Sequence, residues 1–301
     1  MPPSAQASHV DALLTDFSRK YRNGAYVGDV IMPVMPVTKY SDKFARYKKE
    51  STFRIADTTT GFRSEAKKVS WETDTDSYSV QPHGLTDYVT DREKANADPV
   101  YDLELDTTEY LTDQILLARE YEIATMCTTA ANFTNHYTCA GDHQWNSGAA
   151  DATPVTDIRT GISKCVIRPN IMVVGQEVWD VLIEDATLMD KIKYSQTGII
   201  TEALVAQVFG LEKVVVGKAM GYVSGTLTYL WGKNVVLAHV EPPRLKSIQF
   251  GMTFSMTSSH IVRKWPEPKV GGGSTQIEVD YDYQPKVVCA DVAYLIGEAI
   301  S

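Results

Sequence analysis

The side chains best suited to chemistry in this 301-residue chain lie in one short polar segment: His136, Cys139, Asp142 and His143. Imidazole, thiolate and carboxylate groups are the ligands that zinc takes in proteins. Their spacing matches no established zinc motif, because structural sites usually combine two separated pairs of ligands. We therefore interpret the segment as a polar loop, and a metal-dependent hydrolase built on it is a remote alternative.

Other patterns that indicate catalysis are missing from the sequence. No Gly-x-Ser-x-Gly nucleophile turn occurs, and the glycines 271–273 have neither the lysine nor the following helix of a phosphate-binding loop. Acidic pairs such as Asp74 with Asp76 are typical of a charged surface. We expect a protein that is not an enzyme and that has no catalytic residue, cofactor or bound metal.

Composition and charge narrow the class of protein. The chain is 44% hydrophobic, which is enough for a core, and its formal net charge is −9, whereas a sequence-reading DNA or RNA binder usually shows a net basic face. No apolar run approaches the roughly 18 residues of a membrane span. The 4 cysteines form no Cys-x-x-Cys pair, as is typical of reduced thiols in a cytosolic setting. These features predict a soluble intracellular protein without a membrane partner.

Residues 41–98 are more polar than the rest of the chain. Hydrophobic residues make up 17 of these 58, and charged residues make up 21. Such a segment is typical of disorder, yet side chains alternate around Phe44 and Tyr78 as they do in strands. We expect a long two-stranded hairpin with a loose tip, whose arms of about 15 residues would reach about 50 Å. A lone hairpin is marginal in water, so it should lie on a neighbouring copy of the protein.

Charge is segregated along the same part of the chain. Residues 43–68 carry a net charge of +5, and residues 72–113 carry −10. Two solvated faces are one interpretation; the other is that the basic arm of one subunit docks on the acidic region of another, because complementary potentials set partner choice and register. The candidate inter-subunit residues are Lys43, Arg46, Lys48, Lys49, Arg54, Arg63, Lys67, Lys68 and Trp71 in the arm, with Asp102, Glu104, Asp106 and Glu109 in the acidic region.

A long helix is predicted over about residues 99–131, which no Gly or Pro interrupts after Pro99. Asp98 is the expected N-cap, with Pro99 at the first helical position. A seven-residue spacing joins Leu103, Tyr110, Leu117 and Ala124 into one apolar stripe, with Tyr121 on the same side. Because only one stripe is apolar, we expect the helix to lie across a surface.

From residue 154 the pattern changes to alternating helices and strands. Helices are expected near 156–164, 177–184 and 201–209, the last ending at Gly210, which suits a helix C-terminus. Strands are expected at 171–174, 213–216, 227–231 and 234–240. Residues 252–264 and 275–284 are expected to form two strands joined by a Pro/Gly turn, and residues 287–296 a final strand.

The order of these elements, together with several local phrases, resembles the major capsid protein family of tailed bacteriophages, which has the Hong Kong 97-type fold. Each phrase is weak alone, but in this order they span roughly residues 20–298. The phrases are Tyr26–Val37, Asp91–Ala97, Gln144–Trp145 leading to Asp157–Ile158, Asp190–Ser195, Phe209–Gly210 with Val214–Ala219, and Trp231–Asn234.

The resemblance implies an α+β fold with four parts. Residues 1–40 would be an N-arm and 41–92 an extended β-hairpin loop. A peripheral domain would comprise 93–153, with the spine helix, and 246–284. An α/β axial domain would comprise 154–245 and 285–301.

The resemblance also implies a function and partners. The protein would be a structural subunit that assembles with itself, as hexamers and pentamers, into an icosahedral shell around double-stranded DNA that it contacts without sequence specificity. No long N-terminal scaffolding extension is present, so a separate scaffolding protein is expected, with a portal and a decoration protein as further partners. Assembly would take place in the host bacterial cytoplasm and the product would be the virion. The alternative is an encapsulin-type nanocompartment shell of the same fold. The residues give no basis for expecting a covalent cross-link.

Overall fold

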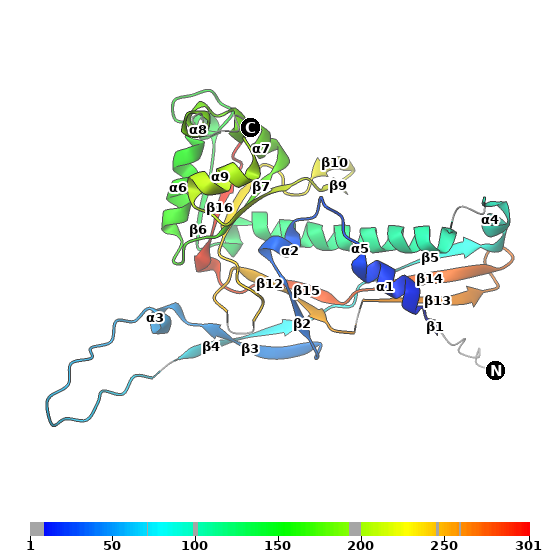
Figure 1. The fold of residues 1–301 in the computed structure, drawn as a ribbon, viewed down its shortest axis with the longest axis horizontal. Coiled ribbons are helices and arrows are strands. Elements are labelled where there is room, and N and C mark those ends of the chain that lie inside the picture. The colour runs from blue at the N-terminus through cyan, green and yellow to red at the C-terminus, as the bar shows by residue number, and fades with distance from the viewer. Residues whose placement is uncertain (1–8, 71, 99–101, 193–199, 245–246, 259) are drawn as a thin grey trace.

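The computed structural model describes residues 9–70, 72–98, 102–192, 200–244, 247–258 and 260–301. Figure 1 shows an elongated molecule in which the long helix α5 (Leu103–Thr128) runs through the middle. A compact region of helices and sheet lies at one end of α5, a narrow sheet lies along the other end, and a thin loop leaves the molecule on the side of the compact region. Within the described residues, no helix is long and apolar enough to cross a membrane.

The compact region is built on a five-stranded sheet. Its strands come from different parts of the chain. Their order across the sheet is β6 (Asn135–Thr138), β16 (Ala293–Gly297), β11 (Val235–Ala238), β7 (Ile171–Gly175) and β8 (Lys213–Gly217). Strand β11 is antiparallel to both neighbours, whereas β7 with β8 and β16 with β6 are parallel. Every residue of β7, β11 and β16 is buried, which shows that both faces of the sheet are covered.

Alternate residues of the sheet enter two separate cores. Met172 and Leu237 face a core formed with α6 (Pro154–Lys164), α7 (Gln176–Glu184), α8 (Ala186–Ile192) and α9 (Glu202–Phe209). Val173 and Val236 face the opposite core, to which the C-terminal part of α5 contributes Ile123 and Cys127. The short helix α2 (Gly28–Ile31) closes this second core from the N-terminal side of the chain. The sheet therefore joins the compact region to the long helix.

A second sheet, the peripheral sheet, packs along the N-terminal half of α5. It is antiparallel, with the order β1 (His9–Val10), β13 (Ile261–Glu267), β14 (Ser274–Asp280) and β5 (Gly84–Thr90). Leu111 and Ile115 of α5 share a core with Val262 and Ile277 of this sheet. Helix α1 (Ala12–Lys20) contributes Leu14 to the same core. Three glycines in left-handed backbone conformations, 271–273, make the turn between β13 and β14.

A third sheet connects the thin loop to the body. It has the order β15 (Tyr283–Val287), β12 (Gly251–Met256) and β2 (Val34–Val37), with β2 parallel to β12. The loop starts and ends as a hairpin of β3 (Ser41–Tyr47) with β4 (Thr73–Ser79), and it contains one short helix, α3 (Lys49–Thr52). A further hairpin, β9 (Met220–Val223) with β10 (Thr226–Tyr229), projects from the compact region over α5 (Figure 1).

Several predicted elements are confirmed and others differ. The helices expected near 156–164, 177–184 and 201–209 are α6, α7 and α9, and Gly210 ends α9 with φ of 66°. The segments 252–264 and 275–284 are each two strands in different sheets, because β12 pairs with β15 and β13 pairs with β14. The hairpin strands β3 and β4 have 7 residues each, so the arms are about half as long as predicted. Strand β5, expected within the extended loop of residues 41–92, pairs with β14 in the peripheral sheet.

The long helix begins and is buried differently from the prediction. Its N-cap is Asp102, whose carboxylate accepts hydrogen bonds from the amides of Glu104 and Leu105, and not Asp98; Pro99 lies outside the described residues. A separate short helix, α4 (Asp91–Asn96), precedes it. A capping box at Thr90 stabilises the N-terminus of α4. Tyr110, expected in the apolar stripe, is 58% exposed. The stripe fails because most of the buried residues of α5 lie on a different face, on which Leu111, Ile115 and Ile123 recur at multiples of four residues.

Candidate assembly interface

The base of the extended loop is fixed to the body by an aromatic contact. Phe44 of β3 and Tyr78 of β4 are buried, and both pack on Phe254 of β12, with ring centroids 5.4 and 4.5 Å from it. Lys286 of β15 donates to Asp76 at 2.7 Å and lies 5.7 Å from the Phe44 ring centroid. Phe254 is fully buried, so this base is part of a core and has a defined direction relative to the body.

The distal part of the loop has no core of its own. Residues 53–70 form neither helix nor strand. Phe53, Ile55, Phe62 and Val69 are exposed there, and Ile55 is 98% exposed. Single exposed apolar side chains are ordinary, but a concentration of them on an extended segment marks a surface that a partner covers. The loop leaves the molecule as a thin excursion without neighbouring elements at its tip (Figure 1).

Half of the predicted basic interface residues pair within the chain. Arg46 lies 3.4 Å from Asp74, Lys48 lies 3.0 Å from Glu72, and Lys67 pairs with Asp57. Lys49 lies 3.4 Å from Asp291, which belongs to the body. These lysine and arginine side chains are largely exposed, so each pair contributes little to stability. Among these acidic partners, Asp74 sits on β4, where antiparallel pairing places it directly opposite Arg46 of β3.

The other predicted interface residues fall into three groups. Asp102 caps α5, and Glu104 pairs with Lys94 at 2.6 Å and with Lys264 at 3.3 Å, so both act inside the subunit. Trp71 lies outside the described residues. The remainder are exposed and take part in no ion pair among the described residues: Lys43, Arg54, Arg63, Lys68, Asp106 and Glu109.

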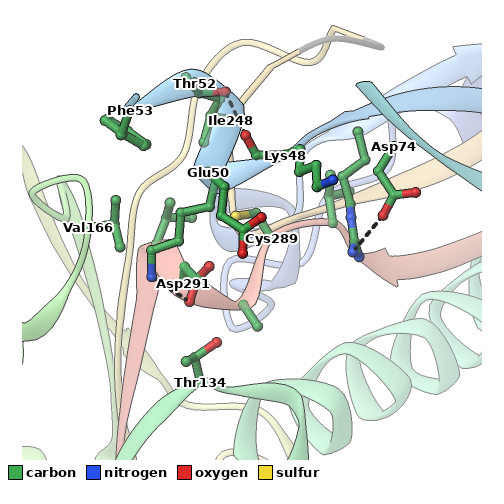
Figure 2. A pocket seen from close by; sticks show the side chains of 15 residues that line it. Lys48, Glu50, Thr52, Phe53, Asp74, Thr134, Val166, Ile248, Cys289 and Asp291 are labelled. Carbon is green, nitrogen blue, oxygen red and sulfur yellow. Dashed lines mark hydrogen bonds and ion pairs between the residues drawn. The ribbon is translucent and has the colours of Figure 1, made fainter. Parts of the chain in front are cut away.

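A cavity of about 390 Å³ lies beneath the start of the loop. Figure 2 shows Lys48, Glu50 and Phe53 of the loop on one side and Cys289 and Asp291 of the body on the other. Burial raises the pKa of the Cys289 thiol, so this sulfur is held as an unreactive thiol at neutral pH. The ion pair of Lys49 with Asp291 closes the cavity on the loop side, so helix α3 rests on the body and the free part of the loop begins after it.

A hollow of about 340 Å³ lies between α5 and the β9–β10 hairpin. Leu117 and Tyr121 line it from α5, and Tyr222 and Leu230 line it from the hairpin side. Tyr222 of the hairpin is 78% exposed. Tyr121 of α5 and Leu227 of the hairpin are exposed as well. The helix stripe that sequence periodicity picked out therefore lies partly at an open apolar surface, which is the kind of surface an apolar partner segment covers.

Glu120 and its neighbour Arg119 on α5 each make buried polar contacts that sequence reasoning missed. The Glu120 carboxylate is 2% exposed and accepts hydrogen bonds from the amides of Val27 and Gly28, at 2.9 and 2.8 Å, and from the Trp231 indole at 2.8 Å. Burial raises the pKa of Glu120, against these hydrogen bonds, which lower it. The contact joins the N-terminal segment, the long helix and the compact region at one carboxylate.

Arg119 makes the neighbouring contact on the peripheral side. Its guanidinium donates to Asp29 at 2.7 Å and to the Tyr281 hydroxyl at 2.8 Å. A signal was present in the sequence, because Arg119 lies four residues from both Ile115 and Ile123 and so shares their buried helix face.

The segment with His136, Cys139, Asp142 and His143, interpreted above as a polar loop, does not gather its side chains around one point. Cys139 is buried, and burial raises its pKa to about 12, whereas His136, Asp142 and His143 are exposed. His136 lies on β6 at the edge of the sheet, whereas Cys139 is buried, so the four side chains have different surroundings. No group of three His, Cys, Asp or Glu side chains in the described part of the chain is placed to hold a metal ion.

The chain is similar to known capsid proteins over nearly its whole length. It is 29% identical to the major capsid protein of Burkholderia phage BcepMu, over 96% of both chains, and 24% identical to that of Pseudomonas phage JBD67, over 97% of both. Among solved structures, a phage-related protein from Bordetella bronchiseptica RB50 is 25% identical, with a TM-score of 0.79 and 98% of both chains covered. A capsid of cyanophage P-SCSP1u shares the fold, with a TM-score of 0.62 at 9% identity, covering 92% of this chain and 89% of the other. No family model matches the sequence.

The long central helix, the compact region, the peripheral sheet and the projecting loop together are the fold of a Hong Kong 97-type capsid subunit. Solved structures that share this fold include phage capsids and a virus-like particle from Pyrococcus furiosus. The nearly full-length similarity to two phage major capsid proteins, together with this fold, shows a structural capsid protein that forms the shell.

Proposed function

We propose that the subunit assembles with copies of itself, as hexamers and pentamers, into an icosahedral shell that encloses phage double-stranded DNA. The observation that carries this proposal is the extended loop, whose base is fixed in a core by Phe254 and whose tip exposes four apolar side chains. A segment that is anchored but not covered needs a partner surface, and in a closed assembly of identical subunits that surface belongs to the next copy.

The hollow between α5 and the β9–β10 hairpin is the surface that suits this tip. It presents Leu117, Tyr121 and Tyr222, which match the apolar character of Ile55 and Phe62. In Figure 1 the loop and the β9–β10 hairpin that borders the hollow lie on different sides of α5, so contacts of the loop tip with such a hollow would pass from one subunit to the next. Such head-to-tail contacts close into rings when the rotation between copies is right.

The candidate interface charges add selectivity to this docking. Lys43, Arg54, Arg63 and Lys68 of the loop and Asp106 and Glu109 of α5 carry opposite signs on the two surfaces. Rim charges of this kind raise the rate of encounter and suppress wrong registers more than they raise affinity. We therefore place the basic loop of one subunit on the acidic N-terminal part of the next subunit's α5.

The remaining partners follow from the same proposal. A separate scaffolding protein, a portal and a decoration protein would act with the subunit, which would assemble in the host bacterial cytoplasm and end in the virion. Packaged DNA makes few specific demands on the wall of the shell, so a subunit with a net charge of −9 is acceptable for this role. The role is structural, so the subunit is proposed to catalyse no reaction.

The test is assembly of loop-tip variants. The subunit is co-expressed with its neighbouring phage genes, and particles are counted by negative-stain electron microscopy. Ile55→Asp with Phe62→Asp should leave the melting temperature of the free subunit unchanged, because both side chains are exposed, and should abolish shells. Thr58→Asp with Ser64→Asp is the matched control, because it adds the same charge to the same loop without removing an apolar side chain, and it should still form shells.

Two results decide against parts of the proposal. Shells of normal size and number from the Ile55→Asp, Phe62→Asp variant would overturn the role of the loop tip. Particles that contain a cargo protein in place of DNA would favour a nanocompartment.

A further inference from the structure

One end of the compact region carries an acidic helix face without cationic partners. Glu177, Asp180 and Glu184 are exposed on α7 and are spaced three and four residues apart, so they share one face of the helix. Asp180 accepts a hydrogen bond from Gln176 at 2.8 Å. None of the three takes part in an ion pair among the described residues. This face is therefore free to meet a basic surface.

The other end carries a basic hollow of about 390 Å³ between α6 and the end of α9. Arg159 and Arg168 line it together with Ser163, Cys165 and Phe209, and none of its lining residues is a carboxylate. The Arg168 guanidinium donates to the carbonyl of Phe209 at 2.9 Å, which holds it at the C-terminus of α9. Arg159 is exposed and, like Arg168, makes no ion pair with the residues that the structure describes.

The chain itself places these two surfaces at opposite ends of one strand. Arg168 lies shortly before the start of β7, and α7 starts directly after its end. A five-residue strand is about 17 Å long, so it separates the hollow from the acidic face. Figure 1 shows α6 along one edge of the compact region and α7 along the other. One subunit therefore cannot bring the two surfaces together.

We propose that the acidic face of α7 in one subunit packs into the Arg159–Arg168 hollow of the next subunit around a ring. This inference rests on the proposed self-assembly and names the surfaces that close the ring. A rotational ring needs two different, complementary patches on each subunit, and these patches have opposite charge, lie on opposite edges and are both unpaired within the chain. Arginine is suited to the role because its planar guanidinium binds a carboxylate through two parallel hydrogen bonds.

The test is an exchange of charges across the contact. Arg159→Glu places a carboxylate against the acidic face of α7, and Asp180→Arg places a guanidinium against the basic hollow. Juxtaposed like charges cost several kcal/mol, so each change alone should lower the yield of shells by about tenfold or more. Combined, the two changes restore opposite charges and should restore the yield. Arg168 stays unchanged because its bond to Phe209 also holds the end of α9.

Lys164→Glu is the matched control. Lys164 is exposed on the same helix as Arg159 but does not line the hollow, so its reversal should leave the yield unchanged. Melting temperatures of the free subunits verify that every variant folds. Normal yields from both single variants, or failure of the combined variant to recover, would overturn the proposed contact. Wild-type particles in the same experiment test self-assembly separately, so the two proposals fail in different ways.

Discussion

Replacing Glu120 by glutamine tests the buried carboxylate that joins three parts of the subunit. Oε1 of Glu120 accepts from the Val27 amide at 2.9 Å and from the Trp231 indole at 2.8 Å, and Oε2 accepts from the Gly28 amide at 2.8 Å. Glutamine has a single oxygen, so it can keep the first two bonds. Its amide NH₂ group then faces the N–H of Gly28, and two donors meet.

The expected cost follows from the donor that loses its acceptor. A buried N–H without a partner costs about 1–3 kcal/mol. In domains of a few hundred residues, each kcal/mol lowers the melting temperature by about 2–4 °C. Glu120→Gln should therefore melt several degrees below the wild-type subunit, as measured by circular dichroism of the unassembled protein.

The pH dependence separates this contact from a general loss of packing. Burial raises the pKa of Glu120 above its ordinary value of 4.5. A carboxyl with a raised pKa stabilises the folded state fully below its unfolded pKa, and that contribution is lost as pH rises through the raised value. Glutamine does not titrate. Glu120→Gln should therefore lack the part of the pH dependence of stability that Glu120 supplies in the wild-type subunit.

Glu109→Gln is the control for this experiment, because Glu109 is exposed on the same helix. Its unfolding free energy should change by less than about 0.5 kcal/mol. An unchanged melting temperature in Glu120→Gln, or an equal fall in both variants, would refute the reasoning. So would a Glu120→Gln variant that keeps the full pH dependence of the wild-type subunit.

Three further outcomes follow from individual contacts. Phe254→Ala should lower the unfolding free energy by about 3–5 kcal/mol in denaturant titrations, because the ring is fully buried between the two hairpin strands and the body; a change below 1 kcal/mol would contradict this. Gly175→Ala should yield little folded subunit on gel filtration, because a Cβ there would lie 1.9 Å from the Gly232 carbonyl oxygen, whereas Gly24→Ala, with open space around it, should fold normally. Burial, and then nearby arginines, lower the pKa of His260 from 6.5 to about 4, so stability should fall as pH drops across that window; His260→Gln should flatten the melting temperature against pH, and an unchanged slope would exclude this histidine as the cause.

Local signals in the sequence were enough to place the helices and strands of the compact region. Pro154 opens α6, Gly210 closes α9 in a left-handed conformation, and the run Ile171–Val174 is fully buried in β7. Each of these signals acts within a few residues, so no knowledge of the partner strands is needed to detect it. The resemblance to tailed-phage capsid proteins rested on the order of such elements.

Pairings between distant segments were beyond the same reasoning. The break between β12 and β13 arises because one strand finds β15 and β2 and the next finds β14 and β1. Alternation of side chains in 252–264 does not reveal that change of partner. The start of α5 was misplaced for a related reason, since Asp98 and Asp102 are both suitable caps and only the tertiary structure selects Asp102.

The candidate interface was partly visible in the charge pattern. Segregation of charge marked the loop correctly as unusual, but the sequence could not show that Glu72 and Asp74 lie beside Lys48 and Arg46 in one hairpin. Sequence alone does not mark the apolar tip, because only the structure shows that Ile55 and Phe62 are fully exposed. The docking roles of the other candidate interface residues stay predictions: Lys43, Arg54, Arg63, Lys68, Asp106 and Glu109.

The threading of the chain through its sheets sets when the subunit can become complete during synthesis. Strand β16 lies between β6 and β11, so the central sheet stays open until residues 293–297 have emerged. The early strand β2 likewise waits for β12. At roughly 5–20 residues per second, a ribosome needs about 15–60 s for this chain. The loop lacks its base on Phe254 until β12 has emerged, so an earlier nascent chain cannot hold the loop in its final direction.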